Sequence, residues 1–241
     1  MIKSRTCQYE AEGKTFKGYI AYPDSNVPTP AVIVAPTWAG CNAFAKKQSE
    51  RMAAWGYVGF AVDVYGDGEV GETKEHCEAL CYPLIADRKS LYNRLKSAYT
   101  ALCQDKRVAS HLISAIGFCF GGLCALDMAR SGLPLISAVS FHGLLIGTVH
   151  QNKADIAPSL LILHGFEDPL VPPEQLLQFQ QEMTARNADW QLHTFAHTAH
   201  AFTNPEAQDK EAGNYYQKTS AKRAYQLARQ FLAQQFIGTI K

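Results

Sequence analysis

Short runs of apolar residues alternate with longer amphipathic stretches along most of this chain. Apolar runs rich in β-branched residues predict buried strands, and apolar positions three or four residues apart predict helices. The predicted strands are Ala31–Ala35, Val58–Val64, Leu112–Gly117, Ile136–Phe141, Ser159–His164 and Gln191–Phe195. The predicted helices are Ala43–Trp55, Asp87–Cys103, Gly121–Arg130, Pro173–Arg186 and Thr219–Phe236. This alternation predicts an α/β fold with a mostly parallel, twisted sheet covered by helices on both faces.

Two segments depart from the alternation. The chain opens with Thr6–Ala11 and Gly13–Tyr22, which predict a hairpin through the turn Glu12-Gly13. Residues 66–86 hold several glycines and acidic residues between a strand and a helix, so we expect an excursion over the edge of the sheet. Ligands of such sheets bind beyond the carboxyl ends of the strands, and this segment is expected to line or cover a pocket. With no linker-like tract, the chain is predicted to form one domain over residues 1–241.

The composition narrows the classes of partner. Of 241 residues, 47% are hydrophobic and 19% are charged, and the net charge of +1 comes from scattered basic residues. This balance argues against nucleic acid or an anionic membrane and favours a small molecule bound by a monomer or weak homodimer. The charged N-terminus does not match a secretory signal, so we expect a cytoplasmic protein. The seven cysteines do not match a disulfide framework, and most of them are predicted to be reduced thiols.

A glycine-rich turn joins one predicted strand to the helix that follows. Leu112–Gly117 runs into the sequence GFCFGG, with Cys119 near its centre. Because glycine has no Cβ atom, the backbone can bend sharply here and raise the cysteine side chain, as in a nucleophile elbow. The positive end of the following helix favours the thiolate, which is the reactive form of cysteine. Cys119 is therefore the predicted nucleophile.

An acid and a base follow the nucleophile in the chain. Asp168 comes just after the strand Ser159–His164, and His200 lies in the loop after Gln191–Phe195. Nucleophile, acid and histidine in this order are typical of the α/β-hydrolase fold. In such a triad the carboxylate orients the imidazole, which pairs with the thiolate and later protonates the leaving alkoxide. The pattern predicts acyl transfer through a cysteine.

Each of these two residues has a neighbour of the same type. Asp168 is favoured over Glu167 because the residue just before proline in this turn is the commoner place for the acid. His200 is favoured over His197 because the apolar pair that follows it can fix the loop against the core. Two further histidines at strand ends are interpreted as hydrogen-bonded structural groups, namely His142 and His164.

When a nucleophile attacks a carbonyl group, negative charge develops on the carbonyl oxygen. Backbone N–H groups usually stabilise this charge by donating hydrogen bonds to the oxygen. One such group belongs to the residue after the nucleophile, here Phe120, and the other to the loop after the first central strand. In that loop the N–H of Trp38 is the best match. The side chain of Trp38 is interpreted as a packing group.

These motifs resemble those of the dienelactone hydrolase family over nearly the whole chain. The resemblance rests on GFCFGG around Cys119, HGFEDPLVP around Asp168, HAF at His200, and VDVYG after the second βα unit. It implies an α/β-hydrolase fold, a Cys-Asp-His triad without cofactor or metal, and cleavage of a small ester or lactone, as by a carboxymethylenebutenolidase. It also implies that Arg88 and Tyr92, four apart on one helix face, approach the substrate carboxylate and the nucleophile. A surface arginine beside a packed tyrosine is the alternative.

Two positions depart from the family pattern. This chain has Thr37 where the family has a glutamate that is thought to help activate the thiol, and Asn204 lies in the region where the family has an arginine. Losing one cationic contact weakens the case for an anionic dienelactone. The resemblance therefore predicts the reaction class without naming the substrate.

Three other classes match parts of the sequence. An exposed low-pKa thiol at Cys119 also suits a thiol-based redox or peroxide-sensing protein, although Cys124 should face inward and serve poorly as its partner. A metal site at His76, Cys77 and Cys81 would have too few ligands. A non-catalytic, hydrolase-like binding protein is the third class, and the intact triad argues against it.

Overall fold

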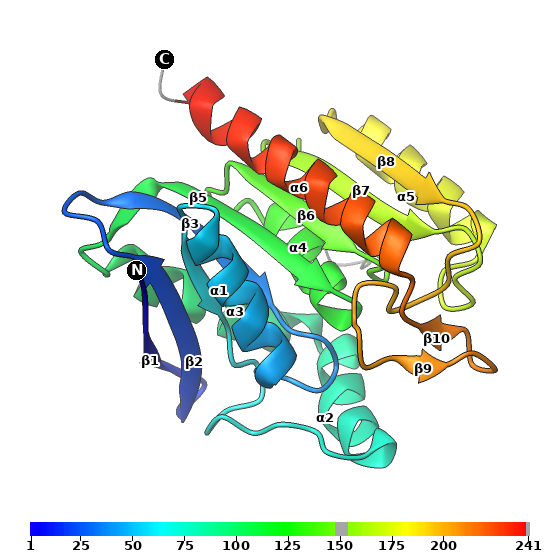
Figure 1. The fold of residues 1–241 in the computed structure, drawn as a ribbon, viewed down its shortest axis with the longest axis horizontal. Helices are drawn as coiled ribbons and strands as arrows, with labels where there is room; N and C mark the ends of the chain where they lie inside the picture. Colours follow the sequence, from blue (N-terminus) through cyan, green and yellow to red (C-terminus); the bar gives the residue numbers. More distant parts are fainter. Residues whose placement is uncertain (148–153, 240–241) are drawn as a thin grey trace. The chain divides into compact units, whose positions relative to one another are not determined.

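The computed structural model describes residues 1–147 and 154–239 (Figure 1). The protein is an α/β protein with a mostly parallel central sheet flanked by helices, as predicted. Its chain separates into two compact units, Met1–Ile116 and Gly117–Lys241, here called the first and second unit. The single domain inferred from the sequence stays a prediction. Among the helices of the described residues, none has the length and apolar character needed to cross a membrane.

The first unit opens with the predicted hairpin. Strands β1 (Ile2–Ala11) and β2 (Lys14–Pro23) pair antiparallel and are joined by two residues, Glu12 and Gly13. Both turn residues have positive φ, 51° and 74°, as the common two-residue hairpin turn requires. Ala11 and Lys14, the residues on either side of this turn, are paired with each other, so the turn sets the register of the two strands.

A βαβ unit follows the hairpin. Strands β3 (Thr29–Ala35) and β4 (Val58–Ala61) pair in parallel, and β4 also pairs antiparallel with β2. Helix α1 (Ala43–Ala54) connects them, beginning at Asn42, whose side chain accepts a hydrogen bond from the N–H of Ala45 at 3.2 Å. Such a cap satisfies one of the N–H groups that a helix start leaves without a partner.

Strand β4 ends at Ala61, three residues before the predicted end at Val64. The reason is Asp63, whose buried carboxylate accepts four backbone hydrogen bonds at 2.9 Å, from the N–H groups of Lys17, Tyr65, Gly66 and Gly68. This side chain turns the backbone out of the ladder because it offers the N–H groups another acceptor. Residues 66–86 then hold helix α2 (Lys74–Ala86), which precedes α3 (Arg88–Cys103).

The second unit carries the remaining elements. Strand β5 (Val108–Phe118) runs across the boundary between the units and leads into α4. Three parallel strands are neighbours in the order β6, β7, β8. The bounds are α4 (Phe120–Arg130), β6 (Ser137–Phe141), β7 (Ser159–Gly165), α5 (Pro173–Ala185), β8 (Trp190–Phe195), β9 (Gln208–Asp209), β10 (Asn214–Tyr215) and α6 (Lys218–Thr239).

Both faces of β6 and β7 are covered, which explains their largely apolar sequences. On one face, Leu160 and Ile162 of β7 join a buried cluster that includes Phe179 of α5. On the other face, Phe141 of β6 packs 5.3 Å, ring to ring, from Tyr225 of α6. Burying each large apolar side chain stabilises the fold by about 1.5–3 kcal/mol. This core fixes the strand ends from which the site loops leave.

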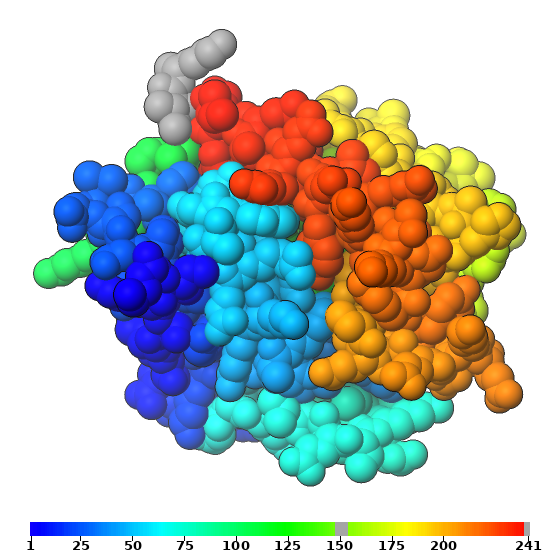
Figure 2. All heavy atoms as spheres, in the orientation of Figure 1, coloured from blue at the N-terminus to red at the C-terminus, as the bar shows by residue number. Residues whose placement is uncertain are grey.

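Two elements of the second unit are visible at the surface in Figure 2. Helix α6 appears as a red band, and its buried side is made by small and apolar residues such as Ala224 and Leu232. The segment with β9 and β10 appears in orange. Gln208 and Asp209 of that hairpin are exposed, so one side of it is open to solvent.

Candidate active site

The connection from β5 to α4 has the backbone of a nucleophile elbow. Cys119 lies at its apex with φ 55° and ψ −118°, a conformation that is costly for a residue with a side chain. Its N–H donates to the carbonyl of Phe141 at 3.1 Å, and its own carbonyl accepts from Gly122 at 2.9 Å. The thiol is half-buried. Phe120 begins α4, and the first N–H groups of a helix have no acceptor within it.

Close packing at the elbow requires its glycines. A Cβ atom on Gly117 would lie 1.8 Å from the carbonyl oxygen of Gly121, and one on Gly122 would lie 2.5 Å from the Cα of Gly143. Neither backbone group can move aside as a side chain can. The glycines therefore let the strand, the turn and the helix approach closely enough to hold the strained cysteine.

Asp168 and His200 form a buried pair in the second unit. The Nδ1–H of His200 donates to Oδ2 of Asp168 at 2.8 Å, and the other carboxylate oxygen accepts from the N–H of Leu170 at 2.9 Å. Asp168 is 5% exposed and His200 is 1% exposed. The carboxylate thus fixes the orientation of the imidazole and leaves Nε2 as the nitrogen that can exchange a proton.

The electrostatics of His200 favour its protonated form. Burial lowers the pKa of this imidazole, but the charge of Cys119, the hydrogen bonds to Asp168 and Cys119, and the charge of Asp168 together raise the pKa to about 10. Nε2 has no hydrogen bond of normal length and angle among the described residues. The carboxylate of Asp168 is therefore the group that holds the imidazole in place.

The two competing residues lie outside this pair. The side chain of His197 is 91% exposed, and its Nδ1 lies 3.3 Å from Oε1 of Glu167, which is also exposed. An ion pair that is exposed to water has no fixed geometry, and dissolved salt screens the attraction between its charges. The geometry favours Asp168 and His200 over these neighbours.

The first unit holds the other residues singled out from the sequence. The carbonyl of Trp38 accepts a hydrogen bond from the hydroxyl of Tyr65 at 2.6 Å. Arg88 and Tyr92 lie on α3, both half-buried, and the amino group of Lys96 lies 6.0 Å from the ring centre of Tyr92. Their roles in an oxyanion hole and in substrate binding stay predictions.

A second histidine lies beside His200 and was not singled out for chemistry. The ring of His142 lies 5.1 Å from that of His200 in an edge arrangement, and its Nε2 lies 2.7 Å from Oγ1 of Thr203. Burial and the charge of His200 hold the pKa of His142 well below its usual value. His142 is hydrogen-bonded, as the sequence suggested, and it stays neutral next to a cationic neighbour.

The hairpin of β9 and β10 supports the histidine loop. The N–H of His200 donates to the carbonyl of Gly213 at 2.9 Å, and the N–H of Tyr215 donates to the carbonyl of His200 at 3.2 Å. A Cβ atom on Gly213 would lie 2.7 Å from the ring of Pro169, next to the acid. Strands of two residues carry no periodicity, so β9 and β10 could not be predicted from the residue pattern.

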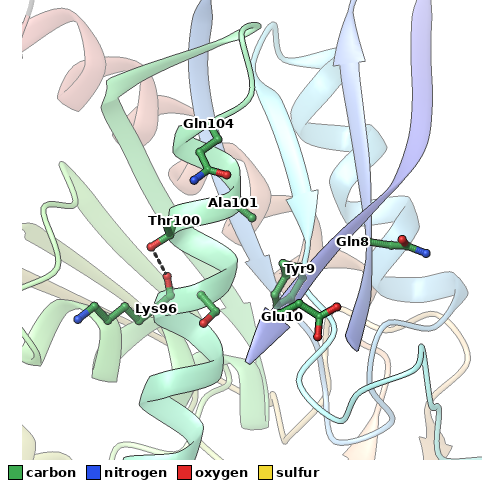
Figure 3. Close-up of a pocket in the computed structure, with 8 residues that line it drawn as sticks. Gln8, Tyr9, Glu10, Lys96, Thr100, Ala101 and Gln104 are labelled. Carbon is green, nitrogen blue, oxygen red and sulfur yellow. Dashed lines mark hydrogen bonds between the residues drawn. The ribbon is translucent and has the colours of Figure 1, made fainter. Parts of the chain in front are cut away.

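A shallow polar groove of about 310 Å³ lies in the first unit between β1 and α3 (Figure 3). The hydroxyl of Thr100 on its wall donates to the backbone carbonyl of Lys96 at 2.9 Å. Most of its lining side chains are polar, and none of the residues predicted for the site is among them. The lining residues are Gln8, Tyr9, Glu10, Lys96, Ser97, Thr100, Ala101 and Gln104.

Metal binding and redox pairing gain no support from the cysteines. Within residues 1–147 and 154–239, no three His, Cys, Asp or Glu side chains are grouped to hold a metal ion. His76 instead lies 3.3 Å from Glu69, and Cys77 and Cys81 are buried. All seven cysteines lie within the described residues and are outside disulfides. Cys124 is fully buried in α4, facing inward as expected.

Comparison with known proteins places this site in context. A sequence profile described as "Dienelactone hydrolase family" matches residues 16–236. A candidate carboxymethylenebutenolidase of Salmonella typhimurium is 26% identical over 235 residues, covering 93% of this chain and 84% of that protein. An uncharacterized protein of Caenorhabditis elegans is 35% identical over 158 residues, 64% of this chain and 99% of that protein. The crystal structure of the dienelactone hydrolase-like promiscuous phosphotriesterase P91, from metagenomic libraries, has a TM-score of 0.93 at 29% identity, covering 97% and 98% of the two chains.

An α/β-hydrolase fold with these relatives defines the protein as a hydrolase of ester or lactone bonds. More narrowly, the chain belongs to the dienelactone hydrolase family.

Proposed function

We propose that the protein opens small ester or lactone bonds with the thiolate of Cys119 as nucleophile, His200 as acid and base, and Asp168 as the group that orients His200. The observation that carries this proposal is the buried 2.8 Å pair of His200 and Asp168, set in the same unit as a cysteine at a strained elbow. The raised pKa of His200 supports an ion pair with the thiolate.

In the first half of the reaction the Cys119 sulfur attacks the carbonyl carbon and the carbonyl π electrons move to its oxygen. The N–H of Phe120, at the start of α4, is suited to stabilise that oxyanion. When the intermediate collapses, the bond to the leaving oxygen breaks and the His200 imidazolium gives that oxygen its proton. The products are an acyl-enzyme thioester and an alcohol, which stays attached to the acyl group when the substrate is a lactone.

The test uses p-nitrophenyl acetate and four variants. Cys119→Ala should abolish turnover, and Asp168→Asn should reduce kcat by about 10³-fold or more, because the imidazole loses its orientation. Glu167→Gln and His197→Ala are matched controls on the neighbouring residues and should stay within about twofold of the unchanged enzyme, since both side chains lie in solvent. Full turnover by Cys119→Ala would refute the proposal.

The substrate class follows from two positions. With Thr37 and Asn204 in place of the acidic and basic residues of the family pattern, we propose that uncharged esters and lactones are preferred over those with a carboxylate. A panel of matched pairs with and without that group, compared by kcat/KM, tests this. The panel includes an aryl phosphotriester, because a structural relative is a promiscuous phosphotriesterase.

A thiol-based redox function remains a second candidate, since the half-buried thiol of Cys119 is the one that sits beside an imidazole. Peroxide consumption followed by mass spectrometry separates the two functions. Rapid oxidation of Cys119 without hydrolysis of any ester or lactone would favour the redox function.

A further inference from the structure

Four buried side-chain atoms of the described residues have no hydrogen-bond partner of good geometry: Ser140 Oγ, His142 Nδ1, His200 Nε2 and Asn214 Oδ1. Buried polar atoms are normally paired, so each exception needs a reason. All four belong to the second unit, and two of the residues, His142 and Asn214, are direct neighbours of His200. The triad explains the free nitrogen of His200 but not the free oxygen of Asn214.

Asn214 is held beside the catalytic imidazole by backbone pairing. It forms a parallel bridge with His200, made by the hydrogen bonds from His200 to Gly213 and from Tyr215 to His200. Residues that are paired in this way project to the same face, with Cβ atoms about 5 Å apart. The carboxamide of Asn214 therefore leaves the backbone on the same side as the ring of His200.

The hairpin around Asn214 is itself braced. Asp209 accepts a hydrogen bond from the N–H of Ala212 at 2.9 Å inside its turn, and Gly213 packs against Pro169. A side chain on such a fixed backbone can hold a small molecule in one orientation. An amide oxygen accepts hydrogen bonds and adds no charge beside the imidazole.

We propose that Oδ1 of Asn214 orients the water molecule that hydrolyses the acyl-enzyme, a role that rests on the function proposed above. That water donates one hydrogen bond to Nε2 of His200 and the other to Oδ1 of Asn214, which directs an oxygen lone pair at the thioester. Asn214 is thus a catalytic residue of the second half-reaction.

The step balances with the groups at hand. The water oxygen bonds to the thioester carbonyl carbon while its proton passes to the neutral Nε2 of His200. The tetrahedral intermediate then collapses and the bond from carbon to the Cys119 sulfur breaks, with the electron pair leaving on sulfur. This releases a carboxylic acid and restores the pair of thiolate and imidazolium.

The experiment separates the two half-reactions. Acylation is followed as release of p-nitrophenolate from p-nitrophenyl acetate by stopped flow with enzyme in excess, and deacylation as decay of the acyl-enzyme by intact mass. Asn214→Ala should acylate within twofold of the unchanged enzyme but deacylate about tenfold more slowly, which corresponds to one lost hydrogen bond. Gln208→Ala, an exposed position of the same hairpin, is the matched control and should change neither rate.

A second variant gives a pH readout that a structural role would not produce. Asn214→Asp keeps an acceptor oxygen but adds negative charge beside His200, which should raise the pH at which the imidazole becomes neutral. Deacylation, which needs the neutral imidazole, should then reach its full rate only at higher pH than in the unchanged enzyme. The alkaline limb of acylation, which needs the imidazolium, should also move to higher pH.

Equal slowing of both half-reactions in Asn214→Ala, or deacylation at the unchanged rate, would overturn the role of Asn214. Failure of the proposed function looks different, because the unchanged enzyme would then form no acyl adduct on Cys119.

Discussion

His200 combines two features that usually oppose each other, nearly complete burial and a raised pKa. Burial favours the neutral imidazole, because a charge loses hydration inside the protein. The neighbouring Cys119 and the carboxylate of Asp168 reverse that preference. The proton on His200 is thus retained by its two neighbours, and removal of the Asp168 carboxylate should change the pH range in which the enzyme works.

This leads to a prediction for the pH dependence of kcat/KM. Because the pKa of His200 is raised to about 10, the imidazolium that we propose as the acid persists up to that pH and is lost above it. In Asp168→Asn the carboxylate charge that favours the imidazolium is absent, whereas burial still favours the neutral imidazole. The pKa of His200 should therefore fall, and the alkaline limb of the profile should move to lower pH. The residual activity of this variant, measured between pH 6 and about 11, gives the profile.

Glu167→Gln is the control for this profile. It removes a carboxylate from the adjacent position, where the side chain is exposed. Its alkaline limb should coincide with that of the unchanged enzyme, and a shift as large as that of Asp168→Asn would contradict the assignment of the acid.

At the scale of elements, the elbow depends on how closely β5 and α4 can meet. All residues of α4, from Phe120 to Arg130, are buried, so the helix cannot move outward to make room. The backbone at Gly117 and Gly121 forms the contact between the strand end and the first helical turn. The strain at Cys119 is therefore held by packing on every side of the helix.

A methyl group added at this contact should be poorly tolerated. Gly117→Ala places a Cβ atom 1.8 Å from a backbone oxygen, and we expect a loss of about 3 kcal/mol or more in the free energy of unfolding. Gly132→Ala is the matched control, because its Cβ meets nothing within 4 Å and only its φ of +79° is unfavourable. It should lose about 1–2 kcal/mol. Urea denaturation of both variants gives the comparison, and equal losses would contradict the packing argument.

The sequence predicted the elements that have a strong hydrophobic period. The strands β3, β6, β7 and β8 and the helices α1, α3, α4, α5 and α6 lie where expected, within a few residues at each end. It missed α2, which lies in a glycine-rich region, and the hairpin β9–β10. The sequence-based prediction also extended β4 past Asp63. The apolar character of these residues does not reveal that the Asp63 carboxylate accepts the backbone hydrogen bonds that would otherwise continue the strand.

The candidate site was predictable where a motif has a fixed position in the fold. Cys119, Asp168 and His200 each follow a strand end, so chain order alone indicated their roles. Asn214 and the contact of His142 with His200 depend on which backbone segments meet in space. No spacing in the sequence encodes that meeting, and a histidine or asparagine in a loop is common.

At the scale of the whole molecule, two of the buried histidines, His142 and His164, should limit stability in acid. Burial holds the pKa of His142 well below its usual value, and that of His164 is also lowered. Below about pH 6.5 these histidines bind protons in the unfolded chain but stay neutral in the folded chain. The free energy of unfolding therefore falls as the pH drops. Each such group contributes up to about 1.4 kcal/mol per pH unit.

His142→Phe tests this prediction. The variant loses the hydrogen bond to Thr203, and we expect it to be less stable at pH 7 by about 1–3 kcal/mol. Between pH 6.5 and about 5, however, its free energy of unfolding should fall less steeply than that of the unchanged protein. His111→Gln, at an exposed position, should keep the original slope. Parallel slopes for all three proteins would contradict the role of His142.

The hairpin β9–β10 contacts the loops that carry Asp168 and His200. Its main chain forms hydrogen bonds with His200, and Gly213 packs against Pro169. Main-chain support leaves little trace in residue identity, so relatives can diverge here without any visible loss of the triad. A redesign that trimmed this surface turn to make a smaller enzyme would keep Cys119, Asp168 and His200 in the sequence, but it would lose Asn214 and the main-chain contacts that hold the two loops in place.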